Sequence, residues 1–284
     1  MSIISVVMVV CNVENKIVEA MESVLNQSFA DFEFIIIDNG STDNTRSIIS
    51  SFHDKRIRFS ENKQNYVKSL NTGLNSSIGK YVAGMDVNDV MHVDRLKIQH
   101  AIMETFWDVT VCSCMEVLCG ATIPGIIVKG QMTGLVELPL MKLLLNDTFI
   151  NPTSFMIRRS FVTANDLSFK NYPYAEFYHF LVETAIRNGS FYIESQPLTY
   201  RRVSNEMLSR KQRKTHLQSL KKIKREIISS LCSINNATFP ALTSLSNAYY
   251  ELSNQKLISE NDFINQFYNF FTKNKEKLKI NEVY

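Results

Sequence analysis

Short apolar runs alternate with amphipathic segments along the N-terminal part of the chain. The runs at 3–10 and 34–37 are rich in Ile and Val, and a third run covers 81–85. Such runs are typical of strands that are buried on both faces of a parallel sheet. Apolar residues recur at helical spacing over 17–25 and 67–78. The alternation predicts an α/β fold in which a mostly parallel sheet is flanked by helices.

Glycine and hydroxyl residues mark the expected ends of these helices. Gly40 supplies a tight turn after the second run. Ser41 or Thr42 is predicted to cap the helix that follows this turn. Gly79 is predicted to close the helix before the third run. The remaining expected elements are strands at 57–59, 109–115, 154–157 and 191–193, helices at 94–105, 138–145 and 176–187, and loops or an edge hairpin over 119–136.

The chain is long enough for one large domain with an extension. Its 284 residues are 45% hydrophobic and 21% charged, so a substantial buried core is expected. We predict a main α/β domain over 1–205 and a helical C-terminal extension over 206–284. The net charge of +3 gives no indication of nucleic-acid binding, and no nucleic acid is expected as a partner.

Cysteine usage and the lack of targeting signals suggest a cytoplasmic protein. There are five cysteines, and no pair has CxxC spacing, which favours reduced thiols. The N-terminus has neither a basic region nor a small-residue cleavage site, so no secretory signal is expected. Residues 227–250 carry no charge but are rich in Ser, Asn and Thr, and are too polar for a membrane span.

Polar side chains follow two of the predicted strands at the point where each strand ends. Asp38 and Asn39 follow the second run, and the third run is followed by Asp86, Asn88 and Asp89. Either group alone would be an ordinary turn or helix cap. In open α/β sheets, however, ligands bind at the carboxyl ends of the strands. The first pair can bond a nucleobase or ribose, and the second group can hold Mg²⁺ or Mn²⁺ with a diphosphate.

These two groups together predict a nucleotide-diphosphate site. The sequence has no Walker lysine motif and no GxGxxG fingerprint. A P-loop ATPase and a Rossmann dehydrogenase are therefore both disfavoured.

Several further stretches extend this pattern in a fixed order. They are Asn12 and Glu14 with Ser23–Phe29; Phe34–Asp43; Ser69–Leu74, Gly79–Tyr81, Met85–Asp89, Arg95–Leu96 and Gln99; and Asn151–Thr153 with Arg158–Ser160 and Ala175–Glu176. In this order and spacing they resemble a family 2 glycosyltransferase, over roughly residues 2–210. The resemblance implies a GT-A type, Rossmann-like fold, with a nucleotide-binding half over about 1–100 and an acceptor half over about 101–205.

The resemblance also implies an activity and a set of site residues. Such enzymes transfer a sugar from a nucleotide-sugar donor, often a UDP-sugar, to a hydroxyl of a saccharide or lipid-linked acceptor, as in the assembly of surface polysaccharide or glycolipid. The implied nucleotide-binding residues are Val10, Asn12, Asp38, Asn39 and Asp86; the implied metal ligands are Asp86, Asn88 and Asp89; and the implied catalytic base is Glu176. The divalent cation, Mn²⁺ or Mg²⁺, would offset charge on the leaving diphosphate. Direct displacement by the acceptor hydroxyl would invert the anomeric centre.

Three positions depart from the family pattern. Asn88 stands where an Asp metal ligand is usual, and an amide oxygen is a weaker ligand for a hard cation. Phe177 stands where an Asp base is usual, and Val203 and Ser204 stand just after Tyr200–Arg201, where family members often have a His that can approach the metal. Two hypotheses stay open: Glu176 acts as the base from a shifted position, or the chain is a catalytically silent nucleotide-sugar-binding or scaffold paralogue. Glu176 is equally compatible with a helix-start acid that faces the helix dipole.

Residues 201–225 form a basic stretch with ten Lys or Arg and one acidic residue. Such a stretch is commonly a solvated helix face. The alternative is peripheral contact with the inner face of the membrane, or attraction to a lipid-diphosphate acceptor, at about 1 kcal/mol per well-placed charge. His92, His179 and His216 have no metal-site spacing and are predicted to lie at the surface.

Overall fold

The structure is a computed structural model that describes most of the chain. The described residues are 2–63, 65–120, 123–128, 133–145, 150, 153–202, 210–235, 241–255, 257–274 and 277–278. The chain folds into two compact units. Unit 1 consists of Met1–Val136, Ile150–Asn171 and Gly189–Met207, and unit 2 consists of Glu137–Phe149, Tyr172–Asn188 and Leu208–Tyr284.

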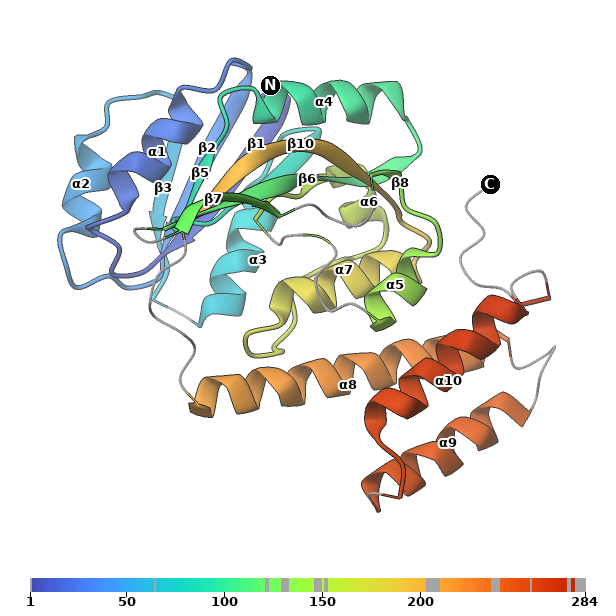
Figure 1. The fold of residues 1–284 in the computed structure, drawn as a ribbon. Coiled ribbons are helices and arrows are strands. Elements are labelled where there is room, and N and C mark those ends of the chain that lie inside the picture. Colours follow the sequence, from blue (N-terminus) through green and yellow to red (C-terminus); the bar gives the residue numbers. More distant parts are fainter. Residues whose placement is uncertain are drawn as a thin grey trace. The chain divides into compact units, whose positions relative to one another are not determined.

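Unit 1 is built on a 10-stranded mixed sheet (Figure 1). Its strands are β1 (Ile4–Val10), β2 (Phe32–Asp38), β3 (Ile57–Glu61), β4 (Tyr81–Met85), β5 (Asp89–Met91), β6 (Val109–Gly120), β7 (Ile123–Val128), β8 (Gly134–Leu135), β9 (Met156–Arg158) and β10 (Ser190–Arg202). The main path follows the order β3-β2-β1-β4-β9-β6-β10-β5. β7 pairs with β6, and β8 pairs with β10.

The N-terminal half of the sheet is parallel, as the apolar runs predict. β1 pairs in parallel with β2 on one side and with β4 on the other, and β3 pairs with β2. Every residue of β2 and of β4 is buried. Val10 is aligned with Asp38, so the ends of β1 and β2 lie side by side. The polar residues that follow these strands therefore meet at one edge of the sheet.

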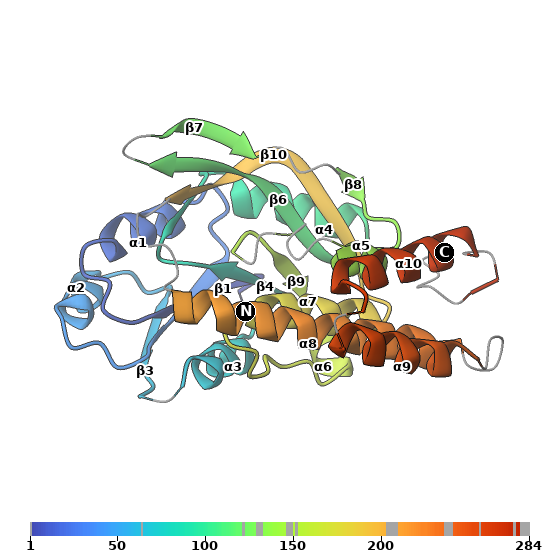
Figure 2. The ribbon, with the colours of Figure 1, turned by 60° about the horizontal axis from the view of Figure 1, so that its bottom comes forward.

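The C-terminal half of the sheet adds antiparallel pairs to this frame. β9 lies antiparallel between β4 and β6, and β5 pairs antiparallel with β10. β6 and β10 pair in parallel, with register shifts around Pro197. Figure 2 shows β6 beside β7, and the two strands form an antiparallel hairpin. Of this hairpin, only β7 and the end of β6 fall within 119–136, the segment predicted as loops or an edge hairpin. Residues 121–122 and 129–132 of that segment lie outside the described residues.

Helices cover both faces of the sheet in unit 1. They are α1 (Ile17–Leu25), α2 (Thr45–Ser51), α3 (Tyr66–Ser76), α4 (Arg95–Thr105) and α6 (Arg159–Ala164). The apolar sides of α1 and α4 share one core cluster with Ile4, Val6 and Met8 of β1. Because side chains alternate along a strand, α3 packs on the opposite face, where Gly73 lies against Val7.

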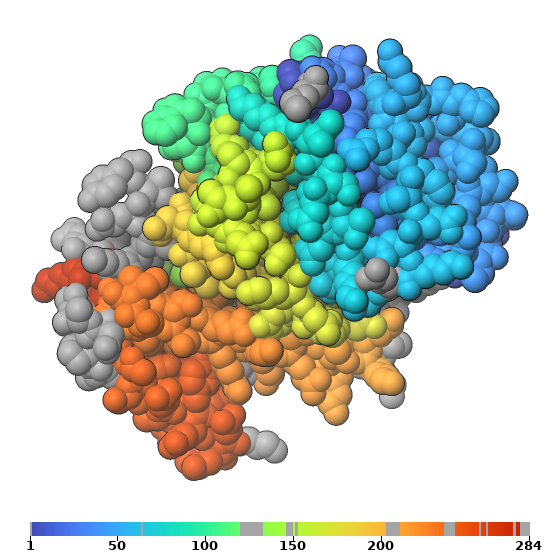
Figure 3. Space-filling view, turned by 180° about the vertical axis from the view of Figure 1, so that it is seen from behind, coloured from blue at the N-terminus to red at the C-terminus, as the bar shows by residue number. Residues whose placement is uncertain are grey.

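α3 is tied to a segment far along the chain. The side chain of Asn71 donates to the Phe169 carbonyl at 2.9 Å and accepts from the Phe169 backbone N–H at 2.8 Å. Figure 3 shows the cyan surface of α3 beside the yellow-green surface of this later segment. This reciprocal pair satisfies a backbone N–H and C=O in a stretch without regular structure.

The helix after the β2 turn is not capped as predicted. α2 begins at Thr45 and has Asn44 as its N-cap residue, without a side-chain cap. Neither Ser41 nor Thr42 caps it, because the Ser41 hydroxyl is bonded to the Asp38 carboxylate instead. The capping prediction was therefore wrong.

Gly79 does not close α3, which ends at Ser76. A Cβ atom at Gly79 would lie 2.7 Å from the Ser5 nitrogen and 2.8 Å from the Ile4 carbonyl carbon. Contacts this short with backbone atoms cannot be relieved by a side-chain movement. The glycine is thus explained by the close approach of this segment to β1.

Unit 2 contains helices from both sides of the predicted boundary after residue 205. They are α5 (Pro139–Leu145), α7 (Glu176–Ile186), α8 (Arg210–Ile234), α9 (Ala241–Asn254) and α10 (Glu260–Lys273). The Tyr178 hydroxyl donates to the Leu143 carbonyl at 2.6 Å and joins α7 to α5. Within the described residues, the structure has no helix with the length and apolar character needed to cross a membrane.

Two side-chain predictions have different outcomes. Cys112 and Cys114 are free thiols buried on β6, in agreement with the reduced thiols expected from the cysteine spacing. His179, predicted at the surface, is buried in α7, and its ring stacks on that of Tyr172 with the centroids 4.1 Å apart. The surface prediction was wrong because it considered only the spacing between histidines, not the inward face of the helix.

Candidate functional site

The turn after β2 is organised around a buried carboxylate. Asp38 accepts hydrogen bonds from the Ser41 backbone N–H at 3.1 Å, from the Ser41 hydroxyl, and from Arg46 Nε at 2.9 Å. Its side chain is fully buried. Gly40 in the same turn has φ of 88°, a conformation that glycine adopts without strain. The Asp38 carboxylate is therefore already engaged by donors of its own turn and of α2.

Two asparagines lie beside this turn and are more accessible. Asn12 is exposed and has φ of 53°, a left-handed conformation that asparagine tolerates. Asn39 is half-buried, and its Oδ1 accepts from the Ser69 hydroxyl at 3.0 Å. The Asn39 backbone N–H donates to the Val10 carbonyl at 2.8 Å. Among the four residues predicted to hold the base, Asn12 and Asn39 present the accessible side chains, whereas Val10 and Asp38 are buried.

The loop from Asp86 to Asp89 joins β4 to β5 and is closed by its own hydrogen bonds. Asp86 Oδ1 accepts from the backbone N–H and from the side-chain amide of Asn88, each at 2.8 Å. The Asp89 backbone N–H donates to the Asp86 carbonyl at 3.0 Å. This is an Asx turn, in which a side-chain oxygen takes the place of a backbone acceptor.

Asp89 is the most buried member of this loop. Asp89 is 2% exposed, and its carboxylate accepts a hydrogen bond from the Thr153 hydroxyl. Burial raises the pKa of Asp89 to about 6, helped by the negative charges of Asp86 and Glu116 and opposed by Thr153 and Arg201. Asp89 thus titrates closer to neutral pH than an ordinary aspartate does.

Arg95 is a fully buried cation close to the start of the loop. Its Nη2 donates to the Gly84 carbonyl at 3.0 Å, and its Nε donates to Gln99 at 3.1 Å. Among the described residues, Arg95 Nη1 has no hydrogen-bond partner. The guanidinium thereby holds the end of β4, from which the loop departs.

Two basic side chains that the sequence pattern did not indicate converge on the same loop. Lys16 Nζ donates to Asn88 Oδ1 at 2.8 Å. Arg202 donates to the Val87 carbonyl at 2.7 Å through Nη2 and to the Asn88 carbonyl at 3.1 Å through Nε. Lys16 precedes α1 and Arg202 ends β10, so these contacts join positions 72 and 114 residues apart. Contacts between residues so far apart in the sequence cannot be predicted from a local sequence pattern.

The predicted metal ligands do not form a ready divalent-cation site. The Asn88 oxygen accepts from an ammonium group, one Asp86 oxygen accepts from two amide donors, and Asp89 accepts from Thr153. In the part of the chain that the structure describes, no group of three or more His, Cys, Asp or Glu is placed to hold a metal ion. Hard divalent cations require several oxygen ligands. The donor set at 86–89 therefore does not fit the predicted Mn²⁺ or Mg²⁺.

Glu176, the predicted catalytic base, is the first residue of α7 in unit 2. Burial raises the pKa of Glu176, and hydrogen bonds from the backbone at Glu176 and Tyr174 oppose this effect. A raised pKa brings a carboxylate closer to the range in which it accepts protons efficiently near neutral pH. The residue after it, Phe177, has no group that accepts a proton.

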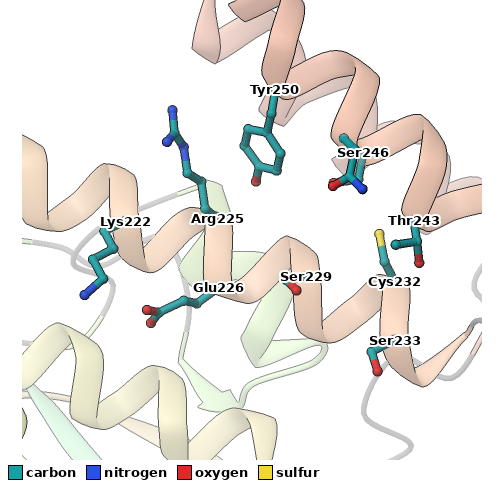
Figure 4. A pocket seen from close by; sticks show the side chains of 10 residues that line it. Lys222, Arg225, Glu226, Ser229, Cys232, Ser233, Thr243, Ser246 and Tyr250 are labelled. Atoms are coloured by element: carbon teal, nitrogen blue, oxygen red, sulfur yellow. The ribbon is translucent and has the colours of Figure 1, made fainter. Parts of the chain in front are cut away.

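A separate pocket of about 590 Å³ lies between α8 and α9 in unit 2 (Figure 4). Arg225 lies over the ring of Tyr250, with 5.1 Å between the guanidinium carbon and the ring centroid. Arg225 Nη2 also donates to Asn254 Oδ1 at 3.1 Å. None of the site residues predicted from the sequence lines this pocket.

The architecture of the chain is shared with solved structures. Residues 1–349 of S. aureus TarS match with a TM-score of 0.65 at 20% identity, over 82% of this chain and 66% of that chain. TarS 1–349 in complex with UDP-GlcNAc matches with the same TM-score. The mannosyltransferase PcManGT of Pyrobaculum calidifontis, solved with GDP-Man and Mn²⁺, matches with a TM-score of 0.54 at 14% identity, over 99% of this chain and 86% of that chain. The fold therefore has the GT-A architecture.

The sequence comparisons define the family. The profile of glycosyl transferase family 2 matches residues 5–163. A glycosyltransferase of Haemophilus influenzae is 32% identical over 240 residues, which are 80% of this chain and 73% of that protein. The chain belongs to glycosyl transferase family 2.

A further relative is similar over a smaller part of the chain. The UDP-Glc:alpha-D-GlcNAc-diphosphoundecaprenol beta-1,3-glucosyltransferase of Escherichia coli is 32% identical over 105 residues. These residues are 36% of this chain and 41% of that enzyme.

Proposed function

We propose that this protein transfers a sugar from a nucleotide-diphosphate donor, a UDP-sugar, to an acceptor hydroxyl. The observation that carries this proposal is that Asn12, Asn39 and the loop Asp86–Asp89 follow neighbouring parallel strands at one sheet edge in a family 2 chain. The TarS complexes with UDP and UDP-GlcNAc and the UDP-Glc donor of the Escherichia coli relative support a uridine donor.

Each residue of this edge has a proposed role. The side chains of Asn12 and Asn39 and the backbone at Val10 bind the base and ribose through amide and carbonyl groups. Asp38 acts through the turn: its bonds to Ser41 and Arg46 set the position of Asn39. The free oxygen of Asp86 takes a ribose hydroxyl, because only its Oδ1 is used within the loop.

The proposed reaction is a single displacement. The acceptor oxygen forms a bond to the anomeric carbon while the bond from that carbon to the diphosphate oxygen breaks. The proton of the acceptor hydroxyl passes to the Glu176 carboxylate, and the nucleoside diphosphate leaves with the bonding electrons. Because the acceptor attacks opposite the leaving group, the anomeric centre is inverted. The raised pKa of Glu176 favours its use as the base.

The proposed acceptor is a saccharide or lipid-linked hydroxyl in the assembly of surface polysaccharide or glycolipid. The lipid-linked acceptor in the name of the Escherichia coli relative supports this class. The N-terminal part of α8 exposes Lys211, Arg213 and Lys214 next to Leu217, whose relative exposure is 52%. These side chains suit peripheral contact with an anionic membrane surface, on the cytoplasmic side in the proposed pathway.

The test is release of UDP from a set of UDP-sugars, with and without lipid-linked acceptors, by purified protein. We expect Asp86→Ala and Glu176→Gln to lower turnover by about 100-fold or more. The exposed residues Asp31 and Glu251 provide matched controls, and Asp31→Ala and Glu251→Gln should keep full activity.

Two other results would change the assignment. A Glu176→Gln protein with full activity would remove Glu176 as the base. A wild-type protein that binds UDP-sugars but turns over none of them would identify the catalytically silent paralogue. The observation that favours this second candidate is Phe177, which replaces a proton acceptor beside Glu176.

A further inference from the structure

The loop between β4 and β5 holds an ammonium group at the oxygen that was expected to bind a metal ion. Lys16 Nζ lies 2.8 Å from Asn88 Oδ1 and donates a hydrogen bond to it. Lys16 is half-buried, and it lies in the connection between β1 and α1 that also contains Asn12. It therefore belongs to the sheet edge at which the nucleotide is proposed to bind.

The position of Lys16 is fixed by the backbone around it. The Lys16 N–H donates to the Val13 carbonyl at 2.9 Å. Arg202 Nη2 donates to the Lys16 carbonyl at 3.2 Å and to the Val87 carbonyl at 2.7 Å. One guanidinium thus ties the backbone of Lys16 to the backbone of the loop that carries Asn88, so the ammonium is held at the loop.

The charge of Lys16 is not neutralised by the residues that the structure describes. Arg202 is paired with Glu19, and Arg201 lies 3.5 Å from a Glu116 oxygen. Lys16 forms no such ion pair within the described parts of the chain, and its bonded partner is a neutral amide. An ammonium has three donor hydrogens, and Asn88 uses one. The other two remain for an anionic ligand.

The asparagine at position 88 and the charge of Lys16 are linked. An aspartate at position 88 would pair with the Lys16 ammonium and cancel its charge, whereas the asparagine oxygen positions the ammonium and leaves the charge in place. Asparagine in place of aspartate at position 88 also makes the loop a weaker ligand for a hard cation. We propose that the Lys16 ammonium, in place of a divalent cation, binds the diphosphate of the donor, so that nucleotide binding does not depend on metal. This inference rests on the proposed function, because it takes the sheet edge to be a nucleotide-diphosphate site.

The test is calorimetric titration of UDP into the purified full-length chain, once in EDTA and once in Mn²⁺. For the wild type we expect Kd values that agree within about twofold, because the lysine supplies the charge in both conditions. Lys16→Met keeps the length of the side chain and removes its charge, and should weaken binding by about tenfold or more in EDTA. Lys97→Met removes the same charge from an exposed position of α4 and should leave binding unchanged.

A double variant tests directly whether the lysine takes the place of the divalent cation. Lys16→Met combined with Asn88→Asp removes the ammonium and introduces a carboxylate, so UDP should bind about tenfold tighter in Mn²⁺ than in EDTA. Thermal unfolding of each variant checks that it is folded. If Lys16→Met does not fold, Lys16→Gln takes its place.

The outcomes separate this inference from the proposed function. Wild-type binding that requires Mn²⁺, or a Lys16→Met protein that binds as well as Lys97→Met, would overturn the role of Lys16 and leave the nucleotide site intact. Failure of the wild type to bind UDP in either condition would overturn both the uridine donor and this inference.

Discussion

The carboxylate of Asp38 illustrates what a family pattern can and cannot predict for a single residue. The pattern places Asp38 at the end of a buried strand, and the structure confirms that location. It does not tell which groups the carboxylate meets, and these are the Ser41 hydroxyl and the Arg46 guanidinium. Both partners lie within a few residues, but the turn that brings them together depends on the positive φ of Gly40.

Glu33 is another buried carboxylate of β2, at the opposite end of the strand from Asp38. Its side chain is 5% exposed and accepts from the Ser5 hydroxyl, the Ile78 backbone N–H and Arg58. Burial by itself would raise the pKa of Glu33, but these three donors outweigh it and hold the pKa below the ordinary value of 4.5. The ionised form is therefore the one that the folded protein stabilises.

The pH dependence of stability follows from this direction. Because the folded-state pKa of Glu33 is depressed, its contribution is fully present above pH 4.5 and is lost as the pH falls through the folded-state pKa. We expect Glu33→Gln to lower the free energy of unfolding by about 2 kcal/mol at pH 7. The difference from wild type should shrink in urea titrations below pH 4.5. A difference that stays constant down to acidic pH would contradict the assignment.

At the scale of elements, the sequence predicts buried strands better than it predicts long ones. β1, β2 and β4 contain the apolar runs seen in the sequence, and the positions of these runs agree with the structure. β10 extends to Arg202, far beyond the predicted 191–193, through a polar stretch that includes Glu194 and Gln196. That stretch is strand because it pairs with β6, and such pairing is not encoded in local hydrophobic periodicity.

The contact between α3 and β1 gives a prediction at the same scale. A Cβ at Gly73 would lie 2.4 Å from Cγ1 of Val7, so Gly73→Ala should lower the free energy of unfolding by about 1–3 kcal/mol. Val7→Ala removes the methyl group that would clash. The double variant should therefore be more stable than the sum of the two single effects by about 1 kcal/mol. Strictly additive effects in urea unfolding would show that α3 does not pack on β1 through this pair.

At the scale of the whole molecule, the charge is unevenly distributed along the sequence. The net charge is only +3, yet residues 201–225 hold ten Lys or Arg and one acid. The other 21 Lys and Arg are outnumbered by 27 Asp and Glu. The net charge of the whole chain does not reveal this uneven distribution, in which a basic stretch accompanies an otherwise acidic chain. Residues 203–209 of this stretch lie outside the described residues.

This polarity predicts binding to anionic lipid vesicles. Changing Lys211, Arg213 and Lys214 together to Glu should reduce retention on phosphatidylglycerol-containing vesicles by about tenfold or more at low salt. The matched control changes three exposed lysines of unit 1, Lys55, Lys68 and Lys97, to Glu and should keep more of the binding. Equal loss in both triple variants would indicate a response to net charge alone, and no retention of the wild type would end the membrane proposal.

At this scale too, the sequence predicted some features of the candidate site and missed others. The order of strands and the polar strand ends predicted a mostly parallel α/β sheet with one edge for a nucleotide, and the resemblance to family 2 glycosyltransferases implied the GT-A fold. The contacts of Lys16 and Arg202 with the loop were not predictable, because they depend on how α1 and β10 approach it in the folded chain. The sequence therefore predicts where the proposed site lies, and the structure is needed to see which charges surround that edge of the sheet.

The central claim is that the carboxyl edge of β1, β2 and β4 binds a nucleoside diphosphate. A crystal structure of the chain grown with UDP tests it most directly. We predict density for the base beside Asn12 and Asn39 and for the diphosphate at the loop Asp86–Asp89, next to Lys16. UDP bound elsewhere, for example between α8 and α9, with this edge left empty at saturating UDP, would contradict the account.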